Sequence, residues 1–126
     1  MILTRDREIS VIGESGSGDG AVEMADKRRP DVIVTDVRMP GMDGFEATRQ
    51  ILAAHPEIAV ILYTAHGERF GMAEGLDCGA RGYVLKDAPP DDIVRAVKRV
   101  AEGGAYVDPT LASELVAPKA TERLPA

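Results

Sequence analysis

The sequence predicts an α/β fold in which helices cover both faces of a parallel sheet. Short apolar runs alternate with amphipathic stretches along most of the 126 residues. The apolar runs are continuous, without a polar residue at every second position, which is typical of parallel strands buried on both faces. Strands that alternate with helices in this way favour right-handed crossovers within one sheet.

Four apolar runs are predicted to be strands. The second run is the strongest candidate, because every residue from Val32 to Thr35 is β-branched. The other runs are also short and continuous, with amphipathic stretches between them. The four expected strands are residues 9–12, 32–35, 60–64 and 82–85.

Helical patterns lie between and after these runs. The last pattern is the clearest, because its apolar residues form one stripe and because prolines mark its start and glycines its end. The third is the weakest, since Gly71 and Gly75 each cost a helix interior about 1 kcal/mol relative to alanine. The expected helices are residues 19–28, 45–54, 69–77 and 91–102.

Length and composition predict one domain followed by an extension. We expect residues 1–104 to form the domain and residues 105–126 to form a C-terminal extension or linker, with a short helical piece around residues 110–116. The formal net charge of −6 argues against a large nucleic-acid surface, which requires a basic face. No apolar run approaches the length of a membrane span.

The single cysteine, Cys78, excludes a disulfide within the chain, and this makes a cytoplasmic setting natural. We interpret Cys78 as a small, partly buried apolar residue near a helix end rather than as a reactive thiol.

A glycine-rich stretch at residues 13–20 follows the first expected strand and leads into a helix. A phosphate-binding P-loop would need a lysine and a serine or threonine where Asp19 and Gly20 stand. The pattern from Gly16 to Ala21, with Asp36 about 20 residues later, imitates a dinucleotide-binding fingerprint better. A nucleotide-binding enzyme is therefore an alternative, but a strand-to-helix turn is the favoured interpretation.

Polar residues stand at the ends of three neighbouring expected strands. Asp36, Thr64 and Lys86 each close one of them. Ligands of parallel α/β sheets bind outside the carboxyl ends of the strands. A carboxylate can act there as a nucleophile, while a hydroxyl and an ammonium hold the charged oxygens of a transferred group. The three residues together predict a phosphoryl-transfer site.

The stretches around these residues resemble receiver domains of the NarL/FixJ (LuxR-type) branch of response regulators. The resemblance rests on Asp36 with the Met-Pro-Gly-Met-Asp-Gly run at residues 39–44, on Thr64-Ala65, and on the run of residues 79–86 that ends in Lys86. It extends from about Ile9 to Val116. It implies a flavodoxin-like (CheY-like) fold and a signalling role in a two-component phosphorelay. It implies a sensor histidine kinase as phosphate donor, and it allows a homodimer.

The resemblance also implies a role for each site residue. Asp36 would accept the phosphoryl group, and Lys86 would pair with it. Thr64 would bond the group and draw its loop inward, after which Tyr83 would swing inward. The peptide bond after the lysine is often cis in this family. A cis Lys86–Asp87 bond would cost about 2.5–4 kcal/mol.

The sequence departs from the family at its N-terminus, so that the expected fold is N-terminally truncated. Receiver domains begin with a further strand, which ends in two acids that hold Mg²⁺, and with a further helix. Here Met1 to Glu8 resembles only the tail of that helix. Mg²⁺ would retain Asp36 and the backbone carbonyl near Arg38, which are too few ligands for a tight site.

Three explanations of this departure stay open. The sequence is a fragment or starts at the wrong methionine, or the chain is a degenerate receiver that binds partners without phosphorylation. In the third, the strand at residues 9–12 moves beside the strand at residues 32–35, and Glu14 replaces a metal ligand. The resemblance implies no enzymatic activity beyond the chain's own phosphoryl acceptance. Without an output domain, direct DNA binding by this chain is not expected.

Overall fold

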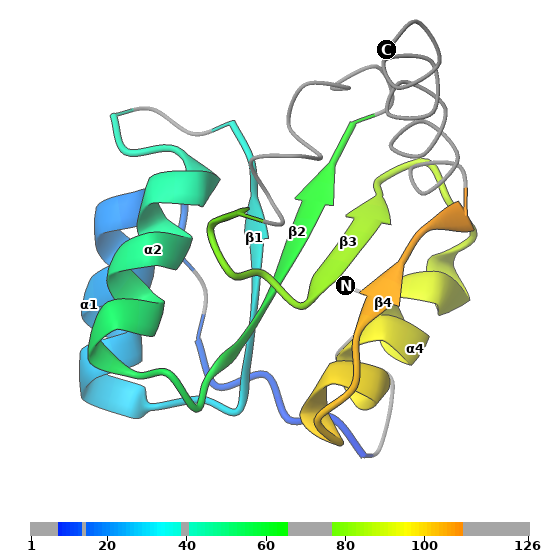
Figure 1. Cartoon of the computed structure of the whole chain (residues 1–126), viewed down its shortest axis with the longest axis horizontal. Helices are drawn as coiled ribbons and strands as arrows, with labels where there is room; N and C mark the ends of the chain where they lie inside the picture. Colours follow the sequence, from blue (N-terminus) through cyan, green and yellow to red (C-terminus); the bar gives the residue numbers. More distant parts are fainter. Residues whose placement is uncertain (1–7, 14, 39–40, 66–76, 110–126) are drawn as a thin grey trace, which may run out of the picture.

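A computed structural model describes residues 8–13, 15–38, 41–65 and 77–109 of the chain (Figure 1). Its centre is a sheet of four parallel strands in the order β1-β2-β3-β4. The predicted α/β fold with a parallel sheet is therefore confirmed. The strands are β1 (Val32–Asp36), β2 (Ala59–Thr64), β3 (Gly82–Leu85) and β4 (Tyr106–Val107).

Helices cover both faces of this sheet. The helices α1 (Gly18–Arg28) and α2 (Gly44–Ala54) lie side by side on one face, and α4 (Pro90–Ala101) packs on the other (Figure 1). Of the helix expected at residues 69–77, only its last residue, Asp77, lies within the described residues, and it is helical. Among the described residues, no helix has the length and apolar character needed to cross a membrane.

Local sequence fixes where each helix begins. The Ser17 side chain accepts a hydrogen bond from the Gly20 amide at the start of α1, at 3.1 Å. Asp43 does the same for α2, with its Oδ1 atom 2.9 Å from the Glu46 amide. At the start of α4, Pro90 occupies the first turn, where its missing N–H costs nothing. Each of these signals is a local one, and the three helices begin within one residue of the predicted positions.

The alternation of side chains along the strands divides the core into two sides. Ile33, Val60 and Leu62 face α1 and α2, whereas Val34 and Ile61 face α4. Both sides of β2 are buried, which explains its continuous apolar sequence. In the register of the sheet, Asp36 is paired with Tyr63, and Thr64 with Leu85. The carboxyl ends of β1, β2 and β3 therefore meet at one edge.

The strand expected at residues 9–12 is wrong. Residues 8–13 contain no strand, and the side chains of Val11 and Ile12 are exposed. The segment is instead held by Lys98, whose Nζ atom lies 3.0 Å from Glu8 Oε1, and by Arg28, which donates to the Ile12 carbonyl oxygen at 3.0 Å. A strand needs a neighbour for its backbone groups, and no described residue provides one for this segment.

The expected move of residues 9–12 to a position beside β1 is wrong for the same reason. Among the described residues, β1 pairs with β2 alone. The edge of β1 that faces away from β2 therefore has no partner strand within the part of the chain that the structure describes.

The sheet continues beyond the boundary expected at residue 104. The β4 strand pairs with β3 through Gly82 with Tyr106 and Tyr83 with Val107. Asp108, which follows β4, is buried. Two residues are too few to give a sequence signal for a strand, so the sequence does not predict β4. The helical piece and linker expected after residue 109 lie outside the described residues.

Candidate functional site

Asp36, Thr64 and Lys86 lie together at the carboxyl edge of the sheet. Asp36 ends β1 and Thr64 ends β2, while Lys86 follows β3 directly. The Lys86 amide donates a hydrogen bond to the Thr64 carbonyl oxygen at 2.7 Å, which ties the ends of β2 and β3 together. Sequence reasoning predicted this grouping, because carboxyl ends of adjacent parallel strands share one edge.

The Asp36 carboxylate and the Lys86 ammonium form a close ion pair through Asp36 Oδ1 and Lys86 Nζ. Both side chains are about half exposed, at 44% and 46%. The Oδ1 atom itself is buried, and although it lies beside the ammonium it accepts no well-aligned hydrogen bond. Oδ1 therefore does not contribute to the exposed surface of the Asp36 side chain. The other carboxylate oxygen is the one that a reagent from solvent can reach.

The loop after Asp36 is closed tightly onto the end of β1. The Gly44 amide donates to the Val37 carbonyl oxygen at 2.8 Å. A side chain at Gly44 would overlap the backbone carbonyl of Asp36, so that only glycine fits there. Gly41, with φ of 76°, adopts a left-handed backbone conformation that favours glycine. These two glycines explain why the loop can return to α2 directly beside the acid.

Comparison with known proteins identifies the family. Residues 1–98 match the family model described as the response regulator receiver domain. The chain belongs to the response regulator receiver family.

Similar proteins place this receiver in the NarL/FixJ (LuxR) branch. It is 37% identical to the transcriptional regulatory protein DegU of Brevibacillus brevis over 115 residues, which cover 91% of this chain and 49% of the relative. It is 34% identical to the response regulator UvrY of Escherichia coli, with 96% of this chain and 57% of the relative covered. The chain thus spans about half the length of the curated relatives that it matches.

Solved structures confirm the CheY-like fold. A LuxR-family response regulator of an Aurantimonas species aligns with a TM-score of 0.87 and 27% identity, over 92% of this chain and 83% of the other. The signal receiver domain of NarL from Mycobacterium tuberculosis aligns with a TM-score of 0.76 and 35% identity, over 81% of this chain and 82% of the other.

The two residues expected to act as a switch in this receiver are both buried. Thr64 and Tyr83 each expose 2% of their surface. Tyr83 packs among Leu62, Leu85 and Phe45 on the face that α2 covers. Tyr83 is therefore in the inward position in this structure. The family resemblance links this position to activation.

The cis peptide bond expected at Lys86–Asp87 is wrong, since the described residues contain no cis peptide bond. The trans form of a non-proline peptide bond is lower in free energy by about 2.5–4 kcal/mol.

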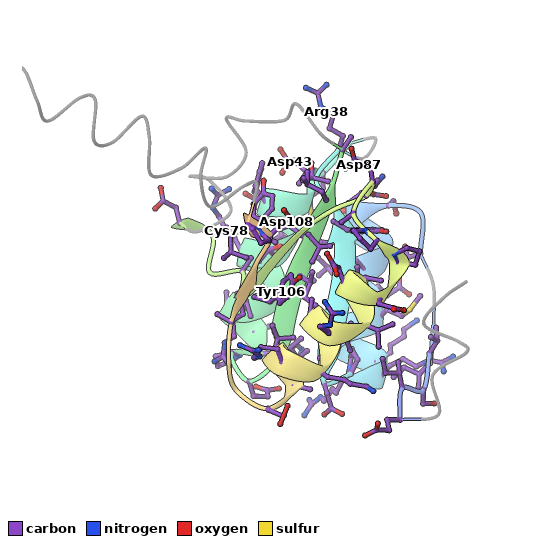
Figure 2. The ribbon with its side chains drawn as sticks, turned by 90° about the vertical axis from the view of Figure 1, so that its right-hand side faces the viewer. Arg38, Asp43, Cys78, Asp87, Tyr106 and Asp108 are labelled. Atoms are coloured by element: carbon purple, nitrogen blue, oxygen red, sulfur yellow. The ribbon has the colours of Figure 1, made fainter. Side chains whose placement is uncertain are left out.

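The described residues do not form a complete magnesium site. They contain no group of three or more His, Cys, Asp or Glu side chains that could hold a metal ion. Asp36 is already engaged by Lys86, and Arg38 follows it with an exposed side chain. Figure 2 shows Arg38, Asp43 and Asp87 at the same end of the molecule. Glu14, the expected substitute ligand, lies outside the described residues.

Thr35 is a site residue that sequence reasoning missed. It is buried, and its Oγ1 atom donates to the Asp36 carbonyl oxygen at 3.2 Å. The β-branched side chain of Thr35 predicts only a position in a strand. The available signal was a hydroxyl group directly before the acid at the end of a buried strand.

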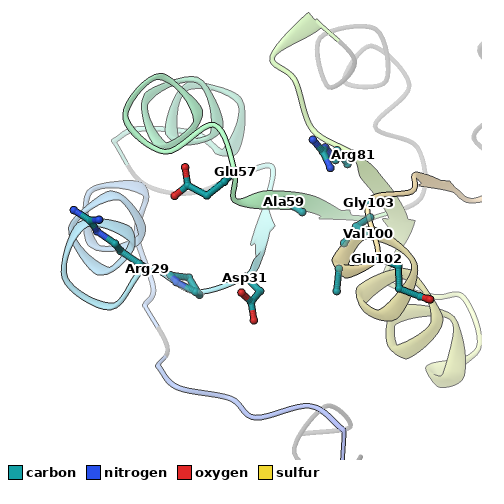
Figure 3. A pocket seen from close by; sticks show the side chains of 10 residues that line it. Arg29, Asp31, Glu57, Ala59, Arg81, Val100, Glu102 and Gly103 are labelled. Carbon is teal, nitrogen blue, oxygen red and sulfur yellow. The ribbon is translucent and has the colours of Figure 1, made fainter.

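Neither of the other candidate sites resembles a phosphate or nucleotide site. In the glycine-rich stretch, the Ser17 side chain caps α1 itself, and Asp19 places a negative charge in the first helical turn. A cavity of about 380 Å³ lies at the opposite end of the sheet, and side chains of both charges line it (Figure 3). Its charged residues are Arg29, Asp31, Glu57, Arg81 and Glu102.

Proposed function

We propose that this receiver domain accepts a phosphoryl group on Asp36 from a sensor histidine kinase and that the phosphoryl group switches its signalling face. The observation that carries the proposal is the half-exposed Asp36 carboxylate at the carboxyl edge of the sheet, with the Lys86 ammonium on its inner oxygen. The family of the chain supports the same function, because receiver domains interact with sensor histidine kinases.

The expected reaction is a direct transfer. The accessible carboxylate oxygen of Asp36 attacks the phosphorus of the kinase's phosphohistidine and forms a P–O bond. The P–N bond breaks, and its electron pair stays on the imidazole nitrogen. Lys86, which already neutralises Asp36, would pair with an oxygen of the transferred group. Receiver domains generally use Mg²⁺, but the described residues make only a partial site for it, so we expect slow transfer.

The switch would begin at the end of β2. A phosphoryl group on Asp36 would attract the Thr64 hydroxyl, which ends the neighbouring strand. Tyr83 lies on the next strand and is already packed inward. The signalling face would then involve β3, β4 and α4, because β4 pairs with β3 and α4 packs against β3. A cytoplasmic setting and a homodimer belong to the same proposal, without direct DNA binding by the described domain.

Incubation with an acyl phosphate and Mg²⁺, followed by intact-protein mass spectrometry, tests the proposal. We expect the addition of one phosphoryl group to the unaltered chain and none to Asp36→Asn. Asp31→Asn is the matched control, because it removes a carboxylate at the other end of the same strand. Uptake by Asp36→Asn would contradict the assignment of the acceptor.

A degenerate receiver that binds partners without phosphorylation is the second candidate. The incomplete set of metal-binding side chains among the described residues favours it, because phosphoryl transfer to Asp36 would then lack a complete magnesium site. This candidate predicts no phosphoryl uptake by the unaltered chain and partner binding that Asp36→Asn leaves unchanged. A nucleotide-binding enzyme would instead show an increase of the melting temperature with nucleotide.

A further inference from the structure

We propose that Gly18 is a positioning residue for the phosphoryl-acceptor loop. In this proposal the N-terminus of α1 supports the loop between β1 and α2 at Met42, and this contact sets the orientation of Asp36. The inference rests on the proposed function, because it concerns the reactivity of Asp36, but the contact itself can be tested without any phosphoryl donor.

The first observation is a close approach between Gly18 and Met42. Gly18 is buried and is the first residue of α1. A Cβ atom at this position would lie 2.6 Å from the Met42 carbonyl oxygen and 2.9 Å from the Met42 Cβ atom. Both distances are shorter than real Cβ atoms show, and one of them involves backbone. The helix therefore reaches the loop only because residue 18 is glycine.

The second observation is that Met42 lies directly before the residues that hold Asp36. The next residue, Asp43, caps α2, and Gly44 donates to the Val37 carbonyl oxygen at 2.8 Å. Gly44 also lies against the backbone carbonyl of Asp36, without room for a side chain. A displacement of Met42 would therefore move Asp43 and Gly44, and the movement of Gly44 would shift the backbone of Asp36.

The third observation is that α1 cannot easily move away from the loop. Ala25, on the inner side of the helix, is fully buried against Ile51, Ile58 and Val60. Asp26 is hydrogen-bonded to His55 at 2.7 Å. With the helix held at its C-terminal half, an added methyl group at residue 18 has to displace the loop.

The neighbouring glycines supply matched controls. A Cβ atom at Gly16 would meet nothing within 4 Å. A Cβ atom at Gly20, in the same helical turn as Gly18, would have side-chain atoms of Ser15 and Ser17 as its three nearest neighbours. The nearest is the Ser15 hydroxyl, which can rotate away. Gly18 is thus the position of this stretch whose nearest contacts include backbone, whereas the nearest contacts at Gly13 and Gly20 are side-chain atoms and Gly16 has none within 4 Å.

The experiment measures the rate of phosphoryl uptake from an acyl phosphate over a range of donor concentrations. We expect Gly18→Ala to lower the maximal rate by about 10- to 100-fold, since a displacement of about 1 Å has effects of that size. The half-saturating donor concentration should stay unchanged. The rates of Gly16→Ala and Gly20→Ala should stay within about twofold of the unaltered chain, because neither substitution displaces the loop. An unaltered rate for Gly18→Ala, or an equal loss in Gly20→Ala, would overturn the proposal.

Two further measurements separate the possible failures. If Gly18→Ala does not fold, Met42→Gly tests the same contact from the other side, because it removes the Met42 Cβ atom that lies against residue 18. A rate equal to that of the unaltered chain would contradict the proposal. If the unaltered chain takes up no phosphoryl group, the proposed function fails. The contact is then judged by NMR: the Gly44 amide resonance should shift in Gly18→Ala and stay in place in Gly20→Ala.

Discussion

The Nε2 atom of His55 lies 2.7 Å from the Oδ1 atom of Asp26, so a hydrogen bond joins the end of α2 to the last turn of α1. The histidine side chain is buried, whereas the aspartate is mostly exposed. A second carboxylate, that of Glu57, lies 3.8 Å from the Nδ1 atom of the same ring. The imidazole ring therefore stands between the carboxylates of Asp26 and Glu57.

We expect His55→Ala to lower the free energy of unfolding by about 1–3 kcal/mol, because it removes a buried ring together with its hydrogen bond. Asp26→Asn should cost less, about 0–1 kcal/mol, since the carboxylate is exposed to water. Urea denaturation followed by circular dichroism measures both values. Glu57→Gln is the control, and a loss there as large as that of His55→Ala would show that the Asp26 contact is not the important one.

The Lys86–Asp36 ion pair should matter for reactivity more than for stability. Both side chains are about half exposed, and exposed pairs contribute little to folding, about 0–1 kcal/mol. We expect Lys86→Ala to slow phosphoryl uptake by about 100-fold or more, because one lost electrostatic contact to the transferred group has effects of that size. The melting temperature should change little.

Lys27→Ala provides the comparison for that experiment, since it removes a lysine from an exposed ion pair with Glu23 on α1. Its uptake rate should equal that of the unaltered chain. Loss of activity in both lysine variants would point to net charge rather than to the position of Lys86.

The Cys78 thiol should react slowly in the folded protein. Burial raises the pKa of this thiol above its ordinary value, so less thiolate is present at pH 8 than in the unfolded chain. The folded state consequently binds the thiol proton more tightly. Its contribution to the free energy of unfolding is complete below about pH 8.5 and is lost as the pH rises through the folded-state pKa.

Alkylation by iodoacetamide, followed by mass spectrometry at several pH values, checks this expectation. The folded chain should react more slowly at pH 8 than the chain in urea, and the difference should shrink as the pH rises. Equal rates at pH 8 would contradict the burial of Cys78 in solution.

The parts of the fold that the sequence predicted well are those with a local cause. The strands at Val32–Asp36 and Gly82–Leu85 follow from continuous apolar runs, and the start of α2 follows from the Asp43 cap. Residues 9–12 have a similar apolar run and yet form no strand, since a strand also depends on a neighbour. Tyr106–Val107 is the reverse case. These two residues carry little sequence signal for a strand, but they form one because they pair with β3.

The candidate site also has features with a local cause, which the sequence predicts, and features that depend on packing, which it does not predict. The convergence of Asp36, Thr64 and Lys86 was predictable, because it follows from strand order and direction alone. The close approach of Gly18 to Met42 was not predictable, since it depends on how deeply α1 packs against α2. The sequence also could not predict which carboxylate oxygen of Asp36, here Oδ1, lies beside Lys86.

The edge of β1 that lacks a described partner strand has a consequence for hydrogen exchange. The Asp31 carbonyl oxygen accepts from the Ala59 amide, so the odd-numbered residues of this strand direct their backbone groups toward β2. The amides of Val32 and Val34 then point to the other edge. We expect their amides to exchange with deuterium much faster than those of Ile33 and Thr35, as NMR would show.

Uniform protection along β1 would mean that another segment covers this edge in solution. With alternating protection, the strand that carries Asp36 would be held from one side only. The strand β1, with Asp36 at its end, would then be among the segments of the domain that unfold locally at the lowest free energy. A partner protein that adds a strand at this edge would hold Asp36 more firmly in place without contacting its carboxylate.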